Sequence, residues 1–212
     1  MTKKILLSLN QRRKNILKII LENKLISMLV LFLLIGMITG SICAKFADND
    51  FIDSLDFLFA SNIKIRAEQA LVDTFISSFT SSFVFTAILI LMGLSAWGIF
   101  LIPFVPFFRG FGLGLIAGFL YSSYGFKGIL FHILVLLPGI FVSSIGIIIE
   151  SRESLNLSVK IISQLSPHGV LMSNRQNLKI YFMRSGYVFI ILALASFIDM
   201  IFNSLFVGLF KF

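Results

Sequence analysis

The sequence is poor in the side chains on which catalytic and metal sites are usually built. It has one cysteine, two histidines and ten carboxylates in 212 residues. One cysteine allows no intramolecular disulfide, and the patterns HExxH, CxxC and GxSxG, which mark zinc, redox and serine-hydrolase sites, do not occur. Because no nucleophile, base and orienting acid can be argued together, we predict a protein that is not an enzyme and binds no cofactor or metal.

Charged residues are also scarce, at 13% of the chain, where a soluble domain has about 25%. Hydrophobic residues make up 58%, and several apolar runs approach the roughly 20 residues that a helix needs to cross about 30 Å of hydrocarbon. We therefore predict an all-α, polytopic integral membrane protein in which residues 25–212 form a single transmembrane domain. About five spans are expected, at residues 25–44, 83–105, 110–124, 128–149 and 187–210.

The distribution of basic residues predicts which segments face the cytoplasm. Seven Lys and Arg residues precede Leu25, against a single acid, and the positive-inside rule places such a segment inside. Five spans then put residues 45–82 outside, residues 150–186 inside and the C-terminus outside. The outer segment has three Lys and Arg residues and the inner loop has five. We expect a multi-pass protein of the cell membrane with a cytoplasmic N-terminus.

Segments outside the spans are predicted to lie on the membrane surface. The net charge of +8 would also suit a nucleic-acid-binding protein, but many of the bases lie within residues 1–24, where they attract anionic lipid headgroups. Apolar residues are interleaved with these bases, which predicts a cytoplasmic interfacial amphipathic helix. Apolar residues at helical spacing predict two further amphipathic helices, at residues 51–82 and 154–165. Membrane lipids are therefore an expected partner, and nucleic acid is not.

Glycines gather in the stretch FFRGFGLGLIAGFLYSSYGFKG at residues 107–128. Its GxGxxA spacing is similar to a dinucleotide-binding turn, but two prolines precede it and the acidic residue required about 20 positions later is missing. In a helix, small residues recur every four positions along one face, which is typical of a helix-packing surface: Gly110, Gly114, Gly118 and Ser122. Arg109, which directly precedes this face, is predicted to anchor the helix end at the headgroup level.

Asp199 is the one acidic residue within a predicted span, at about mid-membrane depth. An intramembrane acid is a candidate functional group and needs a polar partner. Two residues qualify: His132, at a similar depth in another span, and Asn203, one helical turn further along the same span. An interhelical hydrogen bond is one role for this carboxyl group, and a proton relay is the other.

Three motifs resemble the stage II sporulation protein M (SpoIIM) family. They are FFRGFGLGLIAG at residues 107–118, LLPGIFVSSIGIII at residues 136–149, and SPHG in the inner loop. In the last, Ser166 and Pro167 would cap and begin a short helix that includes His168 and Gly169. The resemblance covers most of residues 93–210.

The resemblance implies a non-enzymatic protein of the bacterial cell membrane that acts in forespore engulfment. Such a scaffold would hold a peptidoglycan hydrolase, or its membrane-anchored relative, at the septal membrane. We expect docking through a surface that includes residues 45–82, and homo-oligomers are possible. Two other hypotheses stay open: a transporter or permease subunit that uses Asp199 and broken helices, and a structural protein that organises lipids.

Overall fold

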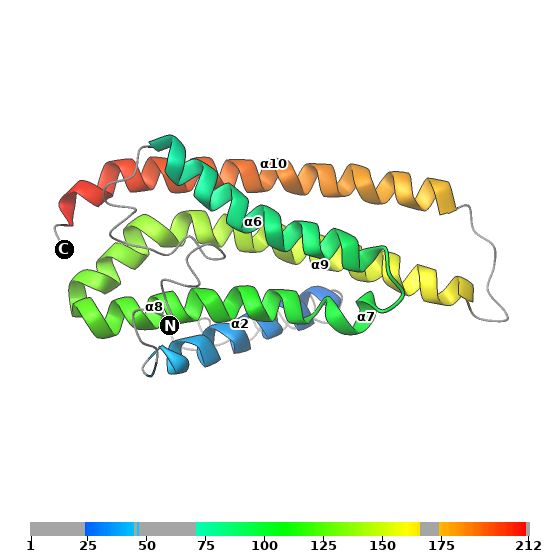
Figure 1. Ribbon diagram of the computed structural model, residues 1–212, viewed down its shortest axis with the longest axis horizontal. Helices are drawn as coiled ribbons and strands as arrows, with labels where there is room; N and C mark the ends of the chain where they lie inside the picture. The colour runs from blue at the N-terminus through cyan, green and yellow to red at the C-terminus, as the bar shows by residue number, and fades with distance from the viewer. Residues whose placement is uncertain (1–23, 45, 47–70, 166–173, 211–212) are drawn as a thin grey trace, which may run out of the picture.

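The computed structural model describes residues 24–44, 46, 71–165 and 174–210, and every regular element in these ranges is a helix (Figure 1). In chain order the elements are α2 (Lys24–Cys43), α6 (Leu71–Gly93), α7 (Gly98–Leu101), α8 (Phe104–Phe131), the π-helix η1 (His132–Leu136), α9 (Leu137–Leu165), α10 (Asn174–Phe206) and the 3₁₀-helix η2 (Val207–Leu209). The predicted all-α class is confirmed.

Four helical stretches within the described ranges are long and apolar enough to cross a membrane: Lys24–Cys43, Leu71–Gly93, Gly98–Gln164 and Gln176–Leu209. This count is one lower than the five predicted spans. The third and fourth predicted spans belong to a single stretch of 67 residues. The short connection predicted between them, at residues 125–127, is helical on both sides of Gly125. The structure therefore has no separate loop between α8 and the residues that follow it.

Gly125 allows this long stretch to reverse its direction. Its φ of 54° and ψ of −130° lie outside the helical region, and a positive φ of this kind favours glycine. As a result, α8 and α9 run side by side (Figure 1). Beyond the turn, a Cβ atom on Gly128 would lie 2.1 Å from the carbonyl oxygen of Leu120. The two arms of the turn therefore approach so closely that a larger residue at position 128 would push them apart.

Several predicted boundaries differ from the structure. Helix α6 spans Leu71–Gly93, where the sequence predicted a span at residues 83–105. Its first residues had been assigned to the outer segment although several of their hydroxyl-bearing side chains are buried, and the last residues of the predicted span belong to α7 and α8. The helix predicted at residues 154–165 is present, but as the last part of α9, which continues to Leu165. Because α10 begins at Asn174, the predicted inner loop at residues 150–186 is largely helical. The predicted N-terminal helix, most of the outer segment and the motif Pro167, His168 and Gly169 lie outside the described residues.

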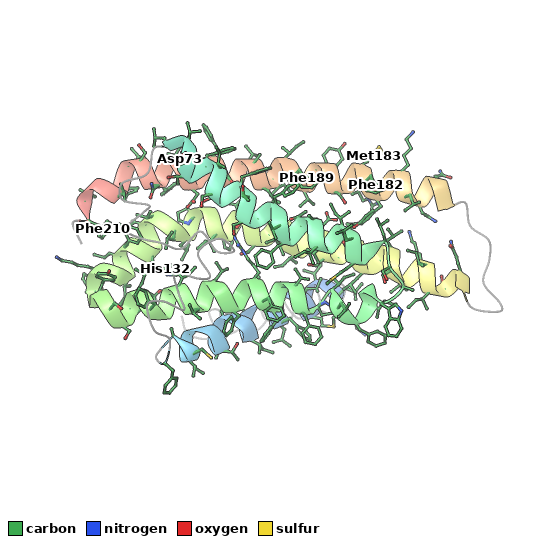
Figure 2. All side chains as sticks on the ribbon, in the orientation of Figure 1. Asp73, His132, Phe182, Met183, Phe189 and Phe210 are labelled. Atoms are coloured by element: carbon green, nitrogen blue, oxygen red, sulfur yellow. The ribbon has the colours of Figure 1, made fainter. Side chains whose placement is uncertain are left out.

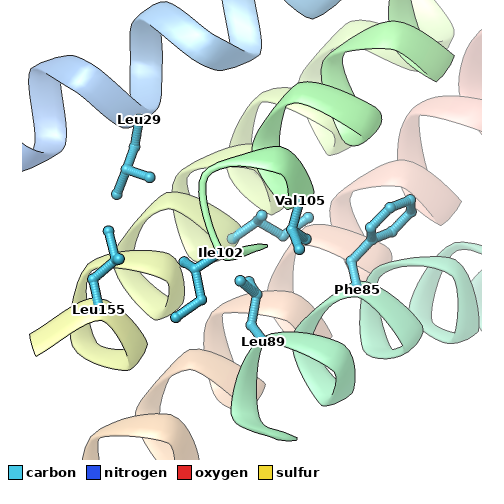
Figure 3. Packing of buried hydrophobic residues seen from close by; sticks show 7 residues of the cluster. Leu29, Phe85, Leu89, Ile102, Val105 and Leu155 are labelled. Carbon is cyan, nitrogen blue, oxygen red and sulfur yellow. The ribbon is translucent and has the colours of Figure 1, made fainter. Parts of the chain in front are cut away.

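The helices pack into a bundle with one shared core. Helix α2 lies along α8, while α6, α9 and α10 lie against one another on the other side (Figure 1). A cluster of buried side chains connects the two parts (Figure 3); it includes Leu29, Phe85, Leu89, Ile102, Val105 and Leu155. Many other apolar side chains point outward from the bundle (Figure 2), which suits a surface in contact with lipid. Because lipid is as apolar as this core, helix association depends on close packing and interhelical hydrogen bonds.

Candidate functional site

The contact between α2 and α8 is built from glycines on both helices. A Cβ atom would lie 2.1 Å from the carbonyl oxygen of Leu33 if placed on Gly110, and 2.0 Å from that of Met37 if placed on Gly114. Glycine at these positions allows the two backbones to touch. The predicted packing face of α8 therefore lies on α2, and this contact fixes the helix that carries Arg109.

Two further observations refine this packing face. A Cβ atom on Gly118 would meet Ala44 at 2.7 Å, so this glycine also faces α2, whereas Ser122 is exposed and lies beyond the packed part of the face. Helix α2 contributes Gly36 and Gly40, whose added Cβ atoms would lie 2.1 and 2.0 Å from carbonyl oxygens of α8. Sequence reasoning missed these two residues, although their spacing of four was the signal that identified the face on α8.

Arg109 lies inside the bundle and not at its surface. Only 4% of the residue is exposed. Its guanidinium donates hydrogen bonds to Ser81 Oγ at 2.9 Å and Ser143 Oγ at 3.3 Å, with Ser82 Oγ at 3.5 Å. The guanidinium carbon also lies 5.3 Å from the centre of the Phe85 ring, within the range of a cation–π contact.

The predicted role of Arg109 as a headgroup anchor is wrong for this reason. Ser81 and Ser82 lie near the middle of α6, about 15 Å from either helix end at the rise of 1.5 Å per residue. A guanidinium held at this depth by hydroxyl groups does not extend to the headgroup layer. The sequence placed Arg109 near the end of a span because α8 had been predicted to begin at residue 110.

Asp199 is also buried, with 4% of the residue exposed, and Ser78 of α6 donates a hydrogen bond to its carboxylate. Ser78 precedes Ser81 and Ser82 by about one helical turn, so the carboxylate and the guanidinium of Arg109 bind neighbouring turns of the same helix. On the α9 side, a Cβ atom on Gly139 would lie 2.5 Å from the Cβ of Asp199. The absence of a side chain at position 139 therefore makes room for the acid.

The two predicted partners of Asp199 occupy different places. Asn203 lies one turn further along α10 and donates from Nδ2 to Thr74 Oγ1 at 3.4 Å. His132 lies near the reversal at Gly125 (Figure 2), where its Nδ1 is 2.7 Å from the hydroxyl group of Tyr121. The sequence had matched His132 to Asp199 by depth alone, and depth does not determine which faces of two helices meet.

These side chains form one buried polar cluster contributed by four helices: Thr74, Ser78, Ser81 and Ser82 of α6, Arg109 of α8, Ser143 of α9, and Asp199 and Asn203 of α10. Each long helix of the bundle except α2 supplies a member. The serines and threonine of α6 recur at intervals of three or four residues, a pattern that could have identified one polar face of a buried helix.

A comparison of the sequence with protein families gives a match over most of the chain. The model of the family described as stage II sporulation protein M matches residues 28–208, which includes all members of the buried polar cluster and both glycine faces. The chain belongs to the SpoIIM family. No curated protein and no solved structure matches the chain.

The cluster gives this SpoIIM family member a specific means of joining its helices. Interhelical hydrogen bonds inside a membrane contribute about 0.6 kcal/mol each on average, and the cluster contains several of them. The guanidinium of Arg109 and the carboxylate of Asp199 each bind a hydroxyl group on neighbouring turns of α6, so each charge is buried with a hydrogen-bond partner. Among the residues that the structure describes, no three His, Cys, Asp or Glu side chains come together as metal ligands. The cluster can therefore connect α6, α8, α9 and α10 through their interior faces.

Proposed function

We propose that this protein is a non-enzymatic membrane scaffold of forespore engulfment. In this role it holds a peptidoglycan hydrolase, or a membrane-anchored relative of one, at the septal membrane of an endospore-forming bacterium. The observation that carries the proposal is the match to the SpoIIM family over residues 28–208. A scaffold needs a stable bundle with a free surface, and it needs no catalytic groups of its own.

The buried polar cluster supports this proposal through its internal connections. Arg109 and Asp199 both bind hydroxyl groups of α6, so the interior polar groups are engaged in holding helices together. This arrangement suits a protein whose outer surface makes the functional contacts.

The orientation in the membrane is part of the proposal. The first residues of α2 and the last residues of α10 lie toward opposite ends of the bundle (Figure 1), because the chain reverses at Gly125. Together with the basic residues near Lys24, this supports a cytoplasmic N-terminus and a C-terminus outside. The hydrolase would then be held on the outer side, where its substrate lies.

Deletion of the gene in an endospore former tests the proposed role. We expect sporulating cells to arrest before engulfment is complete, and expression of the full chain to restore it. A chain that lacks residues 51–66, within the predicted docking segment, should reach the membrane but restore engulfment poorly. The matched control is Gly186→Ala, because no atom lies within 4 Å of a Cβ added there. Normal engulfment in the deletion strain would contradict the proposal.

A transporter or permease subunit is the second candidate, favoured by charged groups at mid-depth. Arg109 and Asp199 are both buried in the bundle interior, and a π-helix follows the reversal of the chain, a feature often found at functional sites. Reconstitution of the purified chain in liposomes tests this candidate. A solute flux that Asp199→Asn abolishes, in a variant that remains folded, would favour transport over the scaffold.

A further inference from the structure

A second buried carboxylate lies outside the polar cluster, near the middle of α9. Glu150 of α9 has no exposed surface, and its Oε1 accepts a hydrogen bond of 2.8 Å from Ser185 Oγ of α10. Its Oε2 is buried and has no hydrogen-bond partner among the described residues. No basic side chain in the described part of the chain forms an ion pair with it either. Arg184, on α10 next to Ser185, is bound at 2.6 Å to Glu153.

Hydroxyl groups surround this carboxylate. Ser154, one helical turn along α9, lies 2.9 Å from Tyr181 of α10, measured between their hydroxyl oxygens. Both hydroxyl groups lie beside the Glu150 carboxyl. The Tyr181 hydroxyl also lies 3.5 Å from the carbonyl oxygen of Ile90 in α6. The polar atoms gathered around this point are thus all oxygens, from one carboxylate, three hydroxyl groups and a nearby main-chain carbonyl.

Helix α6 closes this group of oxygens from the third side. A Cβ atom on Gly93 would lie 2.8 Å from the Tyr181 hydroxyl and 2.9 Å from the Cβ of Ser154. Glycine at this position therefore lets the end of α6 cover the hydroxyl pair. The carboxylate and its neighbours are enclosed by α6, α9 and α10, and contact with bulk water does not offset the burial of the charge.

A buried carboxylate is strongly unfavourable unless a proton or another cation neutralises it. Carboxylate, hydroxyl and carbonyl oxygens are the ligands of hard cations. A single carboxylate supplies one negative charge, which matches a cation of charge one. We propose that Glu150, with the hydroxyl groups of Ser154, Tyr181 and Ser185, binds a monovalent alkali cation. The bound ion neutralises Glu150 and joins α9 to α10 beside the end of α6.

Thermal unfolding of the full chain in detergent tests this site. The buffer contains N-methyl-D-glucamine chloride, which is replaced stepwise by NaCl or KCl at constant ionic strength. Because an ion that binds only the folded state stabilises it by mass action, we expect the melting temperature to rise and saturate with at least one of the two ions. Binding of radioactive ²²Na⁺ or ⁸⁶Rb⁺, the latter in place of potassium, gives a second readout.

Three variants assign the effect to Glu150. Glu150→Gln keeps the shape but removes the charge, and we expect it to abolish the cation dependence. Ser185→Ala should raise the cation concentration needed for half of the stabilisation by about tenfold or more, by analogy with losses at metal sites. This variant remains informative if Glu150→Gln does not fold. Glu153→Gln, a control on the same helix, should retain the dependence of the unchanged chain.

Two results would overturn the cation site. One is a melting temperature that is the same in sodium, potassium and N-methyl-D-glucamine. If that temperature changed only with pH, the carboxyl group would bind a proton in place of a cation. The other is an unaltered cation dependence in both Glu150→Gln and Ser185→Ala. Neither result depends on engulfment or on capture of a hydrolase, so this site and the scaffold proposal are tested separately.

Discussion

Gly114 provides a quantitative test of how α2 and α8 are held together. A Cβ atom at position 114 would lie 2.0 Å from the carbonyl oxygen of Met37, where ordinary contact begins at 3.4 Å. The Gly114→Ala variant therefore requires the two backbones to separate by about 1.4 Å at this point. The obstructing atom belongs to the main chain of a helix, so it cannot move away by a change of rotamer.

The expected cost combines overpacking with the loss of neighbouring contacts. Inserting a methyl group into a well-packed interior costs about 1–3 kcal/mol. Separation at Gly114 also loosens the contacts of Gly36, Gly40 and Gly110. A Cβ atom added to any of these three glycines would lie within 2.1 Å of a carbonyl oxygen of the other helix. Since packing is the main source of helix association in a membrane, we expect the free energy of unfolding to fall by about 2 kcal/mol or more.

Reversible unfolding in mixed micelles of a mild detergent and sodium dodecyl sulfate measures this change. The control is Gly186→Ala on α10, where an added Cβ meets no atom within 4 Å. Because alanine favours a helix over glycine by up to about 1 kcal/mol, the control should be as stable as the unchanged chain or slightly more stable. Equal stability of the Gly114→Ala and Gly186→Ala variants would refute the close-packing argument.

The remaining predictions concern the polar cluster and the orientation of the chain. Arg109→Leu should lower the free energy of unfolding by about 2 kcal/mol, because the buried hydroxyl groups of Ser81 and Ser143 lose a charged donor. The exposed Arg184→Gln should cost less than about 1 kcal/mol, and equal losses in denaturation would contradict the burial argument. Asp199→Asn should fold and function, since the amide preserves hydrogen bonding, whereas Asp199→Leu should lose stability; a folded but inactive Asn variant would instead indicate proton-coupled transport. Reporter fusions after Lys24, within residues 47–70, after Ser158 and at the C-terminus should report inside, outside, inside and outside, and the same side for both ends would contradict the orientation.

Sequence patterns predicted those features that depend on one helix alone. Apolar runs located α2 almost to the residue, and small residues every four positions identified Gly110 and Gly114 as a packing face. The start of α6 was missed because Ser78 and its neighbours look hydrophilic in isolation. Their position inside the bundle is explained by groups from other helices: Ser78 binds Asp199, and Ser81 and Ser82 bind Arg109.

The pairing of side chains across helices was the least predictable part. Depth in the membrane suggested His132 as the partner of Asp199, but the rotation of each helix about its axis decides which side chains meet, and apolar periodicity is weak in helices that are apolar on nearly every face. Glu150 was counted as a charge of the inner loop for a similar reason. Its burial follows from the extension of α9 and α10 beyond the predicted spans.

Capture of a partner from native membranes tests the central proposal most directly. The full chain, tagged at its C-terminus, is solubilised in mild detergent from sporulating cells and purified, with Gly186→Ala as a folded control and the chain lacking residues 51–66 as the comparison. The scaffold proposal predicts that a peptidoglycan hydrolase or its membrane-anchored relative co-purifies with the full chain and the control, and is depleted from the shortened chain. Recovery of the intact protein without any such enzyme, from cells in which the enzyme is present, would contradict it.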